Sequence, residues 1–263
     1  ALAVDDKDRL LAGVSGTDCK LIRFQNGKPE TILEPENSSY IHDITFDRAS
    51  NIYIATGPEG KVYRMGPSGK TASVVYDSQD KNILTITVGP KNFIYAGSDT
   101  RGLVYKIHPF NQTASVLFDS KQDEITDIML DDDNNLYATA TSAKSVSSRV
   151  RAAGITAPEQ AGRPDSDDTE NGNSDGDNEK EKTGAELKTA NTDESKSSAA
   201  APAPQEIKRG SSPKAAGYIY KIDPKGFVTE VFSDMAVFFR MAGQDDKILL
   251  ATGNEAELFS IDP

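Results

Sequence analysis

The chain has 263 residues, 37% of them hydrophobic, and a formal net charge of −12 at pH 7. This charge argues against a nucleic-acid-binding protein, which needs a basic face to displace counterions, and no apolar run approaches the ~20 residues that a membrane span requires. The single cysteine, Cys19, excludes an internal disulfide and any cysteine-based zinc site.

Three segments of the chain align with one another without gaps. They begin IHDITF, ILTITV and ITDIML, and their tyrosines Tyr53, Tyr95 and Tyr137 lie 42 residues apart. The N-terminal stretch ALAVDDKDRLLAGVSGTDCKLIRF and the C-terminal stretch FFRMAGQDDKILLATGNEAELFSI fit the same template. Five imperfect copies at one spacing indicate an internal repeat, and repeats of this period are typical of propellers and solenoids.

Each copy predicts four short strands. In the second copy they cover residues 42–46, 51–56, 61–65 and 72–77, which are rich in β-branched and aromatic residues and are separated by turn-forming residues. A four-stranded unit of this length is typical of a propeller blade. A β-sandwich is the alternative, but it has no reason to repeat one side chain at a fixed interval. We therefore expect an all-β propeller of four-stranded antiparallel blades.

A long insertion interrupts the copy that begins ITDIML. That copy breaks off after ATATSAKS and resumes at GYIYKI, where Tyr220 takes the place expected 42 residues after Tyr105. Ser, Ala, Asp, Glu and Pro dominate the segment between, and such segments bury too little apolar surface to fold. We expect propeller blades at 1–140, a disordered insertion at 141–216 in a loop between a second and a third strand, and the remaining propeller strands at 217–263.

The insertion has two interpretations. It either tethers a partner or is simply tolerated, since a longer surface loop costs little extra entropy. Without it, the chain holds about 4.5 repeats, and we expect an arc of a larger ring. A five-bladed ring with one short blade is the alternative.

Blade topology distributes the loops over two faces. Links between blades and the connections from second to third strands share one face, which we call the loop face. It comprises segments 34–40, 57–60, 77–82, 98–102, 119–124, 233–237 and 253–256, together with the insertion. The remaining hairpin turns form the opposite face, the turn face. Loops held by a rigid scaffold commonly carry function, so we expect a ligand on the loop face.

Arg240 is the most unusual residue of the repeat. In an ungapped alignment it takes the place of Ile44, Ile86 and Ile128 on the first strand, nearest the central channel. A buried charge needs a partner. Arg240 is therefore either exposed at a displaced end blade or directed into the channel, where its planar guanidinium suits an anionic ligand or a carboxylate of another blade.

Two aspartates and a histidine lie at the start of the same strand. Asp43 and Asp127 are two repeats apart with Thr85 between them, and they either line a cation site or are solvated strand ends. His42 beside Asp43 suggests a general base, but no serine or cysteine nucleophile in a recognisable setting accompanies it. Two histidines in the whole chain exclude a multi-histidine metal site.

The repeat core DITFDRASNIYIATGPEGKVYR resembles the blades of NHL-type and gluconolactonase-like propellers, and the blade AGSDTRGLVYKI is similar to those of bacterial propeller proteins. The resemblance implies the blade type, and the bacterial group implies export to the periplasm or the medium. Gluconolactonase-like enzymes hold one divalent cation over the channel with Glu, Asn and Asp side chains from separate blades. That ligand set has no residue-by-residue match in this sequence, so the resemblance does not transfer the activity.

Two functional hypotheses follow. The first is a non-catalytic binding or scaffold module without a cofactor, which recognises a protein or glycan through the loop face. Its carboxylates either diverge or pair with Arg101 and Arg240. His42 belongs to the same candidate binding surface. The second is a metal-dependent lactonase or hydrolase with one divalent cation such as Ca²⁺. Its candidate ligands are Asp43, Asp127, Glu59 and Asn82, and calcium requires their oxygens to converge within about 2.3–2.6 Å of one ion.

Overall fold

The computed structural model describes residues 1–142, 216–253 and 256–263, and these contain nineteen β-strands and one short 3₁₀ turn, η1 (Pro90–Asn92). The first sheet consists of β1 (Leu2–Val4), β2 (Leu10–Val14), β3 (Lys20–Gln25) and β4 (Lys28–Leu33). The second consists of β5 (Tyr40–Phe46), β6 (Ile52–Gly57), β7 (Lys61–Met65) and β8 (Ala72–Asp77). The third consists of β9 (Ile83–Val88), β10 (Ile94–Ser98), β11 (Leu103–His108) and β12 (Thr113–Asp119).

The fourth sheet consists of β13 (Glu124–Leu130), β14 (Leu136–Thr141), β15 (Gly217–Ile222) and β16 (Val228–Asp234), and the fifth of β17 (Phe238–Gln244), β18 (Lys247–Thr252) and β19 (Leu258–Ile261). All strand pairs are antiparallel and follow the chain order. The predicted all-β fold of four-stranded antiparallel blades is confirmed. No helix in the described ranges is long and apolar enough to cross a membrane.

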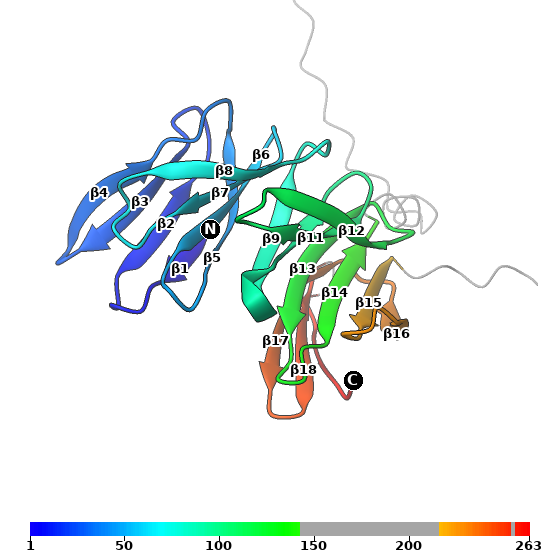
Figure 1. The fold of residues 1–263 in the computed structure, drawn as a ribbon. Helices are drawn as coiled ribbons and strands as arrows, with labels where there is room; N and C mark the ends of the chain where they lie inside the picture. The colour runs from blue at the N-terminus through cyan, green and yellow to red at the C-terminus, as the bar shows by residue number, and fades with distance from the viewer. Residues whose placement is uncertain (143–215, 254–255) are drawn as a thin grey trace, which may run out of the picture. The chain divides into compact units, whose positions relative to one another are not determined.

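Successive sheets lie side by side in chain order (Figure 1). The first strand of each sheet contacts the first strand of the next, so β1, β5, β9, β13 and β17 form the innermost row. Four clusters of buried apolar side chains fill the four interfaces between neighbouring sheets. The hydrophobic core is therefore divided among the interfaces, and the removal of apolar surface from water there holds the sheets together.

The repeated tyrosines have a structural role in these interfaces. Tyr53 and Tyr137 are buried, and their hydroxyls donate hydrogen bonds to Asp47 (3.2 Å) and Asp131 (3.3 Å) in the turn after the innermost strand. Each of these aspartates also accepts hydrogen bonds from the asparagine four residues later. The recurring pattern Asp-x-x-x-Asn-x-Tyr thus shapes the hairpin turn and satisfies the buried hydroxyl, as buried polar groups require.

Strand pairing continues across the interrupted blade. Tyr220 of β15 pairs with Ala138 of β14, as Tyr105 pairs with Ala96 in the third sheet. Tyr220 therefore occupies the repeat position that the sequence predicted. The segment predicted to be disordered, apart from its first two residues and its last one, lies outside the described residues, and the boundaries 141–216 remain a prediction.

The predicted equivalence of Arg240 with Ile44 is wrong by one residue. Met241 pairs with Leu250 as Ile44 pairs with Ile54, so Met241 takes the core position. The cause is the hairpin turn that follows β17, where only two residues separate the paired Gln244 and Lys247. The corresponding turn of the second sheet places three residues between Asp47 and Asn51. An ungapped alignment cannot register this shortening.

Candidate functional site

Four successive innermost strands carry a polar side chain at one shared position. Each of β5, β9, β13 and β17 has a bulge near its loop-face end, and the residue after the bulge resumes pairing with the second strand of its sheet. A bulge inserts one residue and re-aims the neighbouring side chains. We call the residues at this position the central cluster: Asp43, Thr85, Asp127 and Arg240.

The carboxylates of the central cluster join neighbouring sheets. Asp43 accepts hydrogen bonds from the backbone N–H of Ile44 (3.0 Å) and from that of Ile86 in the next sheet (3.0 Å). Asp127 accepts one from the backbone N–H of Met241, also in the next sheet (2.6 Å). Hydrogen bonds to an ionised acceptor are stronger than neutral ones. Each carboxylate therefore joins one blade to the next by hydrogen bonds.

Thr85 and Arg240 connect the two carboxylates to each other. The Thr85 hydroxyl lies 3.2 Å from Asp43 Oδ2 and 3.4 Å from Asp127 Oδ1, and it has one proton to donate between them. The Arg240 guanidinium donates to Asp127 Oδ1 at 2.8 Å and to Asp43 Oδ1 at 3.4 Å. Arg240 thereby links the fifth sheet to the fourth and to the second.

Burial differs sharply within this group. The side chains of Asp43 and Asp127 are 13% and 5% exposed, whereas the Arg240 side chain is 57% exposed. Burial raises the pKa of Asp127, and the Met241 N–H and the Arg240 charge offset this only in part. Desolvation acts against the charge of Arg240, but the attraction of both carboxylates raises its pKa above the ordinary value. Two carboxylates and one guanidinium leave the cluster with a formal charge of −1.

His42 belongs to a second network that borders the central cluster. Its Nε2 lies 3.1 Å from Asn82 Oδ1, and the Asn82 amide donates to Asp99 Oδ2 at 2.6 Å. With the amide so oriented, Nε2 is the protonated ring nitrogen of His42. Burial lowers the pKa of His42, and the ring stacks on the half-exposed Tyr40 at a centroid distance of 5.5 Å. A side chain at Gly57 would collide with Asn82 and His42, so glycine is required there.

Arg101 and Glu59 lie in networks of their own. The Arg101 guanidinium pairs with Asp80 and donates to the Tyr105 hydroxyl (2.9 Å), which in turn donates to Asp80 (2.6 Å). Burial and the hydrogen bond to Asp80 raise the pKa of Tyr105 above its ordinary value. Glu59 pairs with Lys61. Neither Arg101 nor Glu59 shares a hydrogen bond or ion pair with the central cluster in the described residues.

The structure thus brings three of the candidate residues into direct contact, namely Asp43, Asp127 and Arg240. The four candidate metal ligands fall into three networks, because Asn82 and Glu59 lie apart from the two aspartates. Within the described ranges, no three His, Cys, Asp or Glu side chains are grouped so that they could hold a metal ion. The sequence carried the signal for Asp43, Thr85 and Asp127 in their 42-residue spacing. Arg240 aligns with them once a one-residue gap is placed in the first hairpin turn of the last copy.

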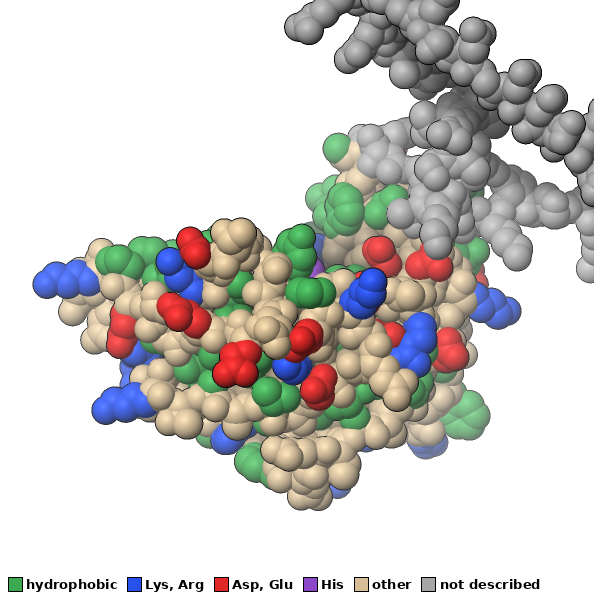
Figure 2. All heavy atoms as spheres, turned by 90° about the horizontal axis from the view of Figure 1, so that it is seen from above, with side chains coloured by type: hydrophobic (Ala, Val, Ile, Leu, Met, Phe, Trp, Pro, Cys, Tyr) green, Lys and Arg blue, Asp and Glu red, His purple; other side chains and the backbone are tan. Residues whose placement is uncertain are grey.

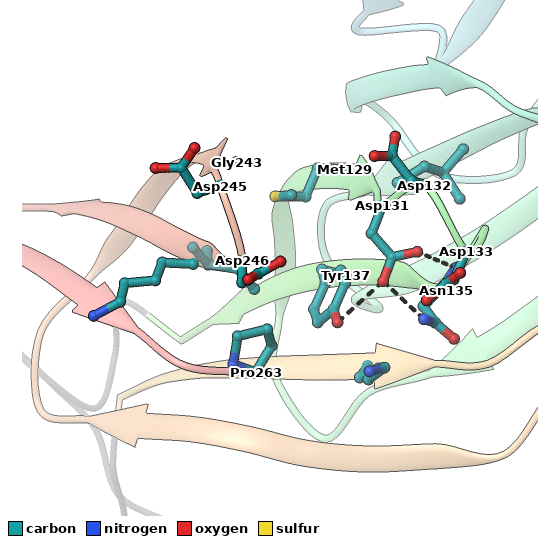
Figure 3. A pocket seen from close by; sticks show the side chains of 14 residues that line it. Met129, Asp131, Asp132, Asp133, Asn135, Tyr137, Gly243, Asp245, Asp246 and Pro263 are labelled. Atoms are coloured by element: carbon teal, nitrogen blue, oxygen red, sulfur yellow. Dashed lines mark hydrogen bonds between the residues drawn. The ribbon is translucent and has the colours of Figure 1, made fainter.

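A second polar region lies on the turn face between the fourth and fifth sheets. A pocket of about 460 Å³ there is lined by several aspartates, and Figure 3 shows Asp132 and Asp245 on opposite sides of it. Asp131 is bonded within its own turn, to Asn135 (2.7 Å) and Tyr137 (3.3 Å) (Figure 3). The carboxylate of Asp131 is therefore a turn constituent.

Comparison with known proteins extends to the fold. No family model matches the chain, and no curated protein matches it. Similar solved structures include a chain of a nidogen/laminin complex (TM-score 0.60, 10% identity, 99% of this chain and 74% of that chain). They also include virginiamycin B lyase from Staphylococcus aureus (0.57, 12%, 99% and 68%) and XC5397 from Xanthomonas campestris, a gluconolactonase (0.57, 10%, 100% and 71%). These likenesses establish that the chain has the β-propeller fold.

Proposed function

We propose that the chain is a non-catalytic recognition module that binds a protein or glycan on its loop face, centred on Arg240. The observation that carries this proposal is the state of that side chain. Arg240 is fixed by two buried carboxylates and is still 57% exposed. A charged donor that is both pre-positioned and accessible is what a binding site requires, because little ordering remains to be done when the ligand arrives.

The chemistry of Arg240 defines what it can take. A guanidinium has five N–H donors in a planar fork, and the two hydrogen bonds to Asp43 and Asp127 leave three of them. These suit carbonyl, hydroxyl or carboxylate oxygens of a ligand. The acidic groups of the cluster are already bonded to backbone N–H groups and to Arg240, so they act as supports for the donor.

The surroundings suit a macromolecular partner. Acidic, basic and hydrophobic side chains are interspersed over the face shown in Figure 2, and the whole chain carries a net charge of −12. A negative surface accelerates association with a partner of positive potential. The nidogen/laminin complex is an instance of protein recognition by a chain of similar fold. At 10% identity this likeness concerns the fold alone, so the proposal rests on the geometry of the site in this chain.

A metal-dependent hydrolase is the second candidate, and one observation favours it. Asp43 and Asp127 approach the same Thr85 hydroxyl at 3.2 and 3.4 Å, so two carboxylates and a hydroxyl already share one small region. A cation would have to displace the Arg240 guanidinium from that region. XC5397, one of the similar structures, is a gluconolactonase.

The test compares defined peptide and glycan arrays on the wild-type chain and on Arg240→Lys. The substitution keeps the positive charge and removes the planar fork. We expect the ligands of the wild type to bind Arg240→Lys about ten-fold more weakly. The control is Lys225→Gln, at an exposed turn-face position, which should bind the same ligands with unchanged affinity. Ligands that bind Arg240→Lys with the same affinity as the wild type would overturn the proposal. Stoichiometric binding of Ca²⁺, Zn²⁺ or Mn²⁺ in calorimetry, lost in Asp43→Ala or Asp127→Ala, would favour the hydrolase.

A further inference from the structure

A separate pocket lies at the other end of the innermost strands, where β5, β9 and β13 reach the turn face. It has a volume of about 480 Å³, within the range of small-molecule sites. Phe46, Val88 and Leu130, the last residues of the three strands, line it with half-buried apolar side chains. They stand 42 residues apart, so the repeat itself places one apolar side chain per blade here. We call this the turn-end pocket.

The two exposed charged side chains of the turn-end pocket are both positive. Arg48 and Lys91 line it and are exposed, and neither takes part in an ion pair in the described part of the chain. The single acidic side chain of the lining, Asp47, is 7% exposed and fully engaged in its own turn. It accepts from the backbone N–H groups of Ala49 and Asn51, both at 2.9 Å.

Two asparagines complete the polar side of the pocket. Asn92 and Asn134 occupy equivalent turn positions and have φ values of 59° and 64°. Asparagine is among the few residues besides glycine that adopt this left-handed conformation readily. Both line the pocket, where their amides add hydrogen-bond donors beside the two cations.

We propose that the turn-end pocket binds a small organic anion, whose acidic group lies between Arg48 and Lys91 and whose apolar part rests on Phe46, Val88 and Leu130. An unpaired Arg and Lys attract carboxylates and phosphates, and the apolar floor favours a ligand with a hydrocarbon or aromatic portion. The neighbouring pocket of the turn face, lined by Asp131 and other aspartates, disfavours anions. The proposed site is independent of the loop face and of Arg240.

The experiment measures binding of four probes of similar size to the whole chain at low salt, by calorimetry and ligand-observed NMR. Benzoate and phenyl phosphate carry the two kinds of acidic group, benzyl alcohol is neutral, and benzylammonium is a cation. We expect one-to-one binding of at least one anion and none of the other two probes. The stronger of the two anions identifies the acidic group as carboxylate or phosphate.

The matched variants are Arg48→Gln/Lys91→Gln and the control Lys70→Gln/Lys225→Gln, which removes the same charge from exposed turns outside the pocket. The first should weaken anion binding about ten-fold or more, and the control should leave it within about two-fold. All four side chains are exposed, so both variants should fold. Three results would overturn the proposal. They are benzyl alcohol binding as tightly as the anions, Arg48→Gln/Lys91→Gln binding the anions as tightly as the wild type, and no anion binding at about 10 mM ligand.

Discussion

The two ends of the innermost strands use the same kinds of side chain in opposite ways. At the loop-face end, the charges of Asp43, Asp127 and Arg240 bind one another and the backbone of the next sheet. At the turn-face end, Arg48 and Lys91 have no ionic partner among the described residues and line an open pocket. The charges at the loop-face end are paired with one another and leave only the remaining donors of Arg240 for a ligand, whereas Arg48 and Lys91 at the turn-face end are not engaged in ion pairs within the described residues.

The aspartates of the two ends differ in the reach of their hydrogen bonds. Asp127 at the loop-face end bonds to Met241 and Arg240 of the next sheet, more than one hundred residues away in the chain. Asp131 at the turn-face end bonds to Asn135 and Tyr137, four and six residues away. Loop-end carboxylates therefore hold blades to each other, whereas turn-end carboxylates shape single hairpins. This contrast can be tested by substitution at matched positions.

The largest effect should come from Asp127→Ala. The substitution leaves the buried Met241 N–H without its acceptor and removes the shorter ion pair of Arg240. We expect the free energy of unfolding to fall by about 3 kcal/mol, because a buried donor loses its partner and a charge network is broken. Urea unfolding followed by circular dichroism measures this loss.

The matched control for Asp127→Ala is Asp132→Ala. Asp132 is exposed at the turn-face end, and its removal should change the free energy of unfolding by less than about 0.5 kcal/mol. If the two variants were equally stable, the central cluster would not be joining the blades, and the contrast between the two ends would be lost.

Substitution of Arg240 should have an intermediate effect. Arg240→Met leaves Asp43 and Asp127 facing each other without a cation, and we expect a loss of about 1–2 kcal/mol, less than for a fully buried ion pair because the guanidinium is half exposed. Arg240→Lys keeps the charge and should recover most of this stability. Thermal unfolding of both variants at low and high salt measures the difference, which salt should reduce. Equal melting temperatures for Met and Lys would show that the charge of Arg240 contributes nothing.

Much of the fold was predictable, because the repeat is encoded in side chains that each blade needs. Strands predicted at 42–46, 51–56, 61–65 and 72–77 are found within two residues of those bounds. The buried Tyr53 and Tyr137 keep their spacing because they occupy equivalent interface positions, and each bonds to the aspartate of its own hairpin turn, Asp47 or Asp131. Strand and turn preferences depend on neighbouring residues in the chain, so they can be inferred directly from the sequence.

The site was predictable in part. Asp43, Thr85 and Asp127 share a spacing that follows from the uninterrupted repeat, so their common position could be inferred. The pairing of Arg101 with Asp80, by contrast, depends on the conformation of loops that differ between blades. The same holds for the bond between Asn82 and Asp99. Long-range contacts among variable loops leave no periodic signal in a single sequence.

The smallest effect should appear in the dependence of stability on pH. This dependence should have opposite signs for Asp127 at the loop-face end and Asp131 at the turn-face end. Burial raises the pKa of Asp127. Asp131 is also desolvated, but hydrogen bonds from Asn135 and Tyr137 outweigh this and lower its pKa. The unfolded value is 3.8 for both. Ionisation of Asp127 therefore lowers the free energy of unfolding increasingly as the pH rises from 3.8 through the folded pKa of Asp127. Ionised Asp131 instead contributes stability above pH 3.8, and this contribution is lost as the pH falls through the folded pKa of Asp131.

Asp131→Asn should accordingly flatten the loss of stability on acidification, and Asp127→Asn should steepen it. The free energy of unfolding in urea, measured between about pH 3 and pH 6 for the wild type and both variants, gives the two slopes. The slope is the informative quantity, since Asp127→Asn also lowers stability at every pH by weakening the contact with Arg240. Slopes that changed in the same direction would mean that the two carboxylates share one kind of environment. Opposite changes would show that ionisation costs stability at Asp127, where the blades are joined, and adds stability at Asp131, in a hairpin turn.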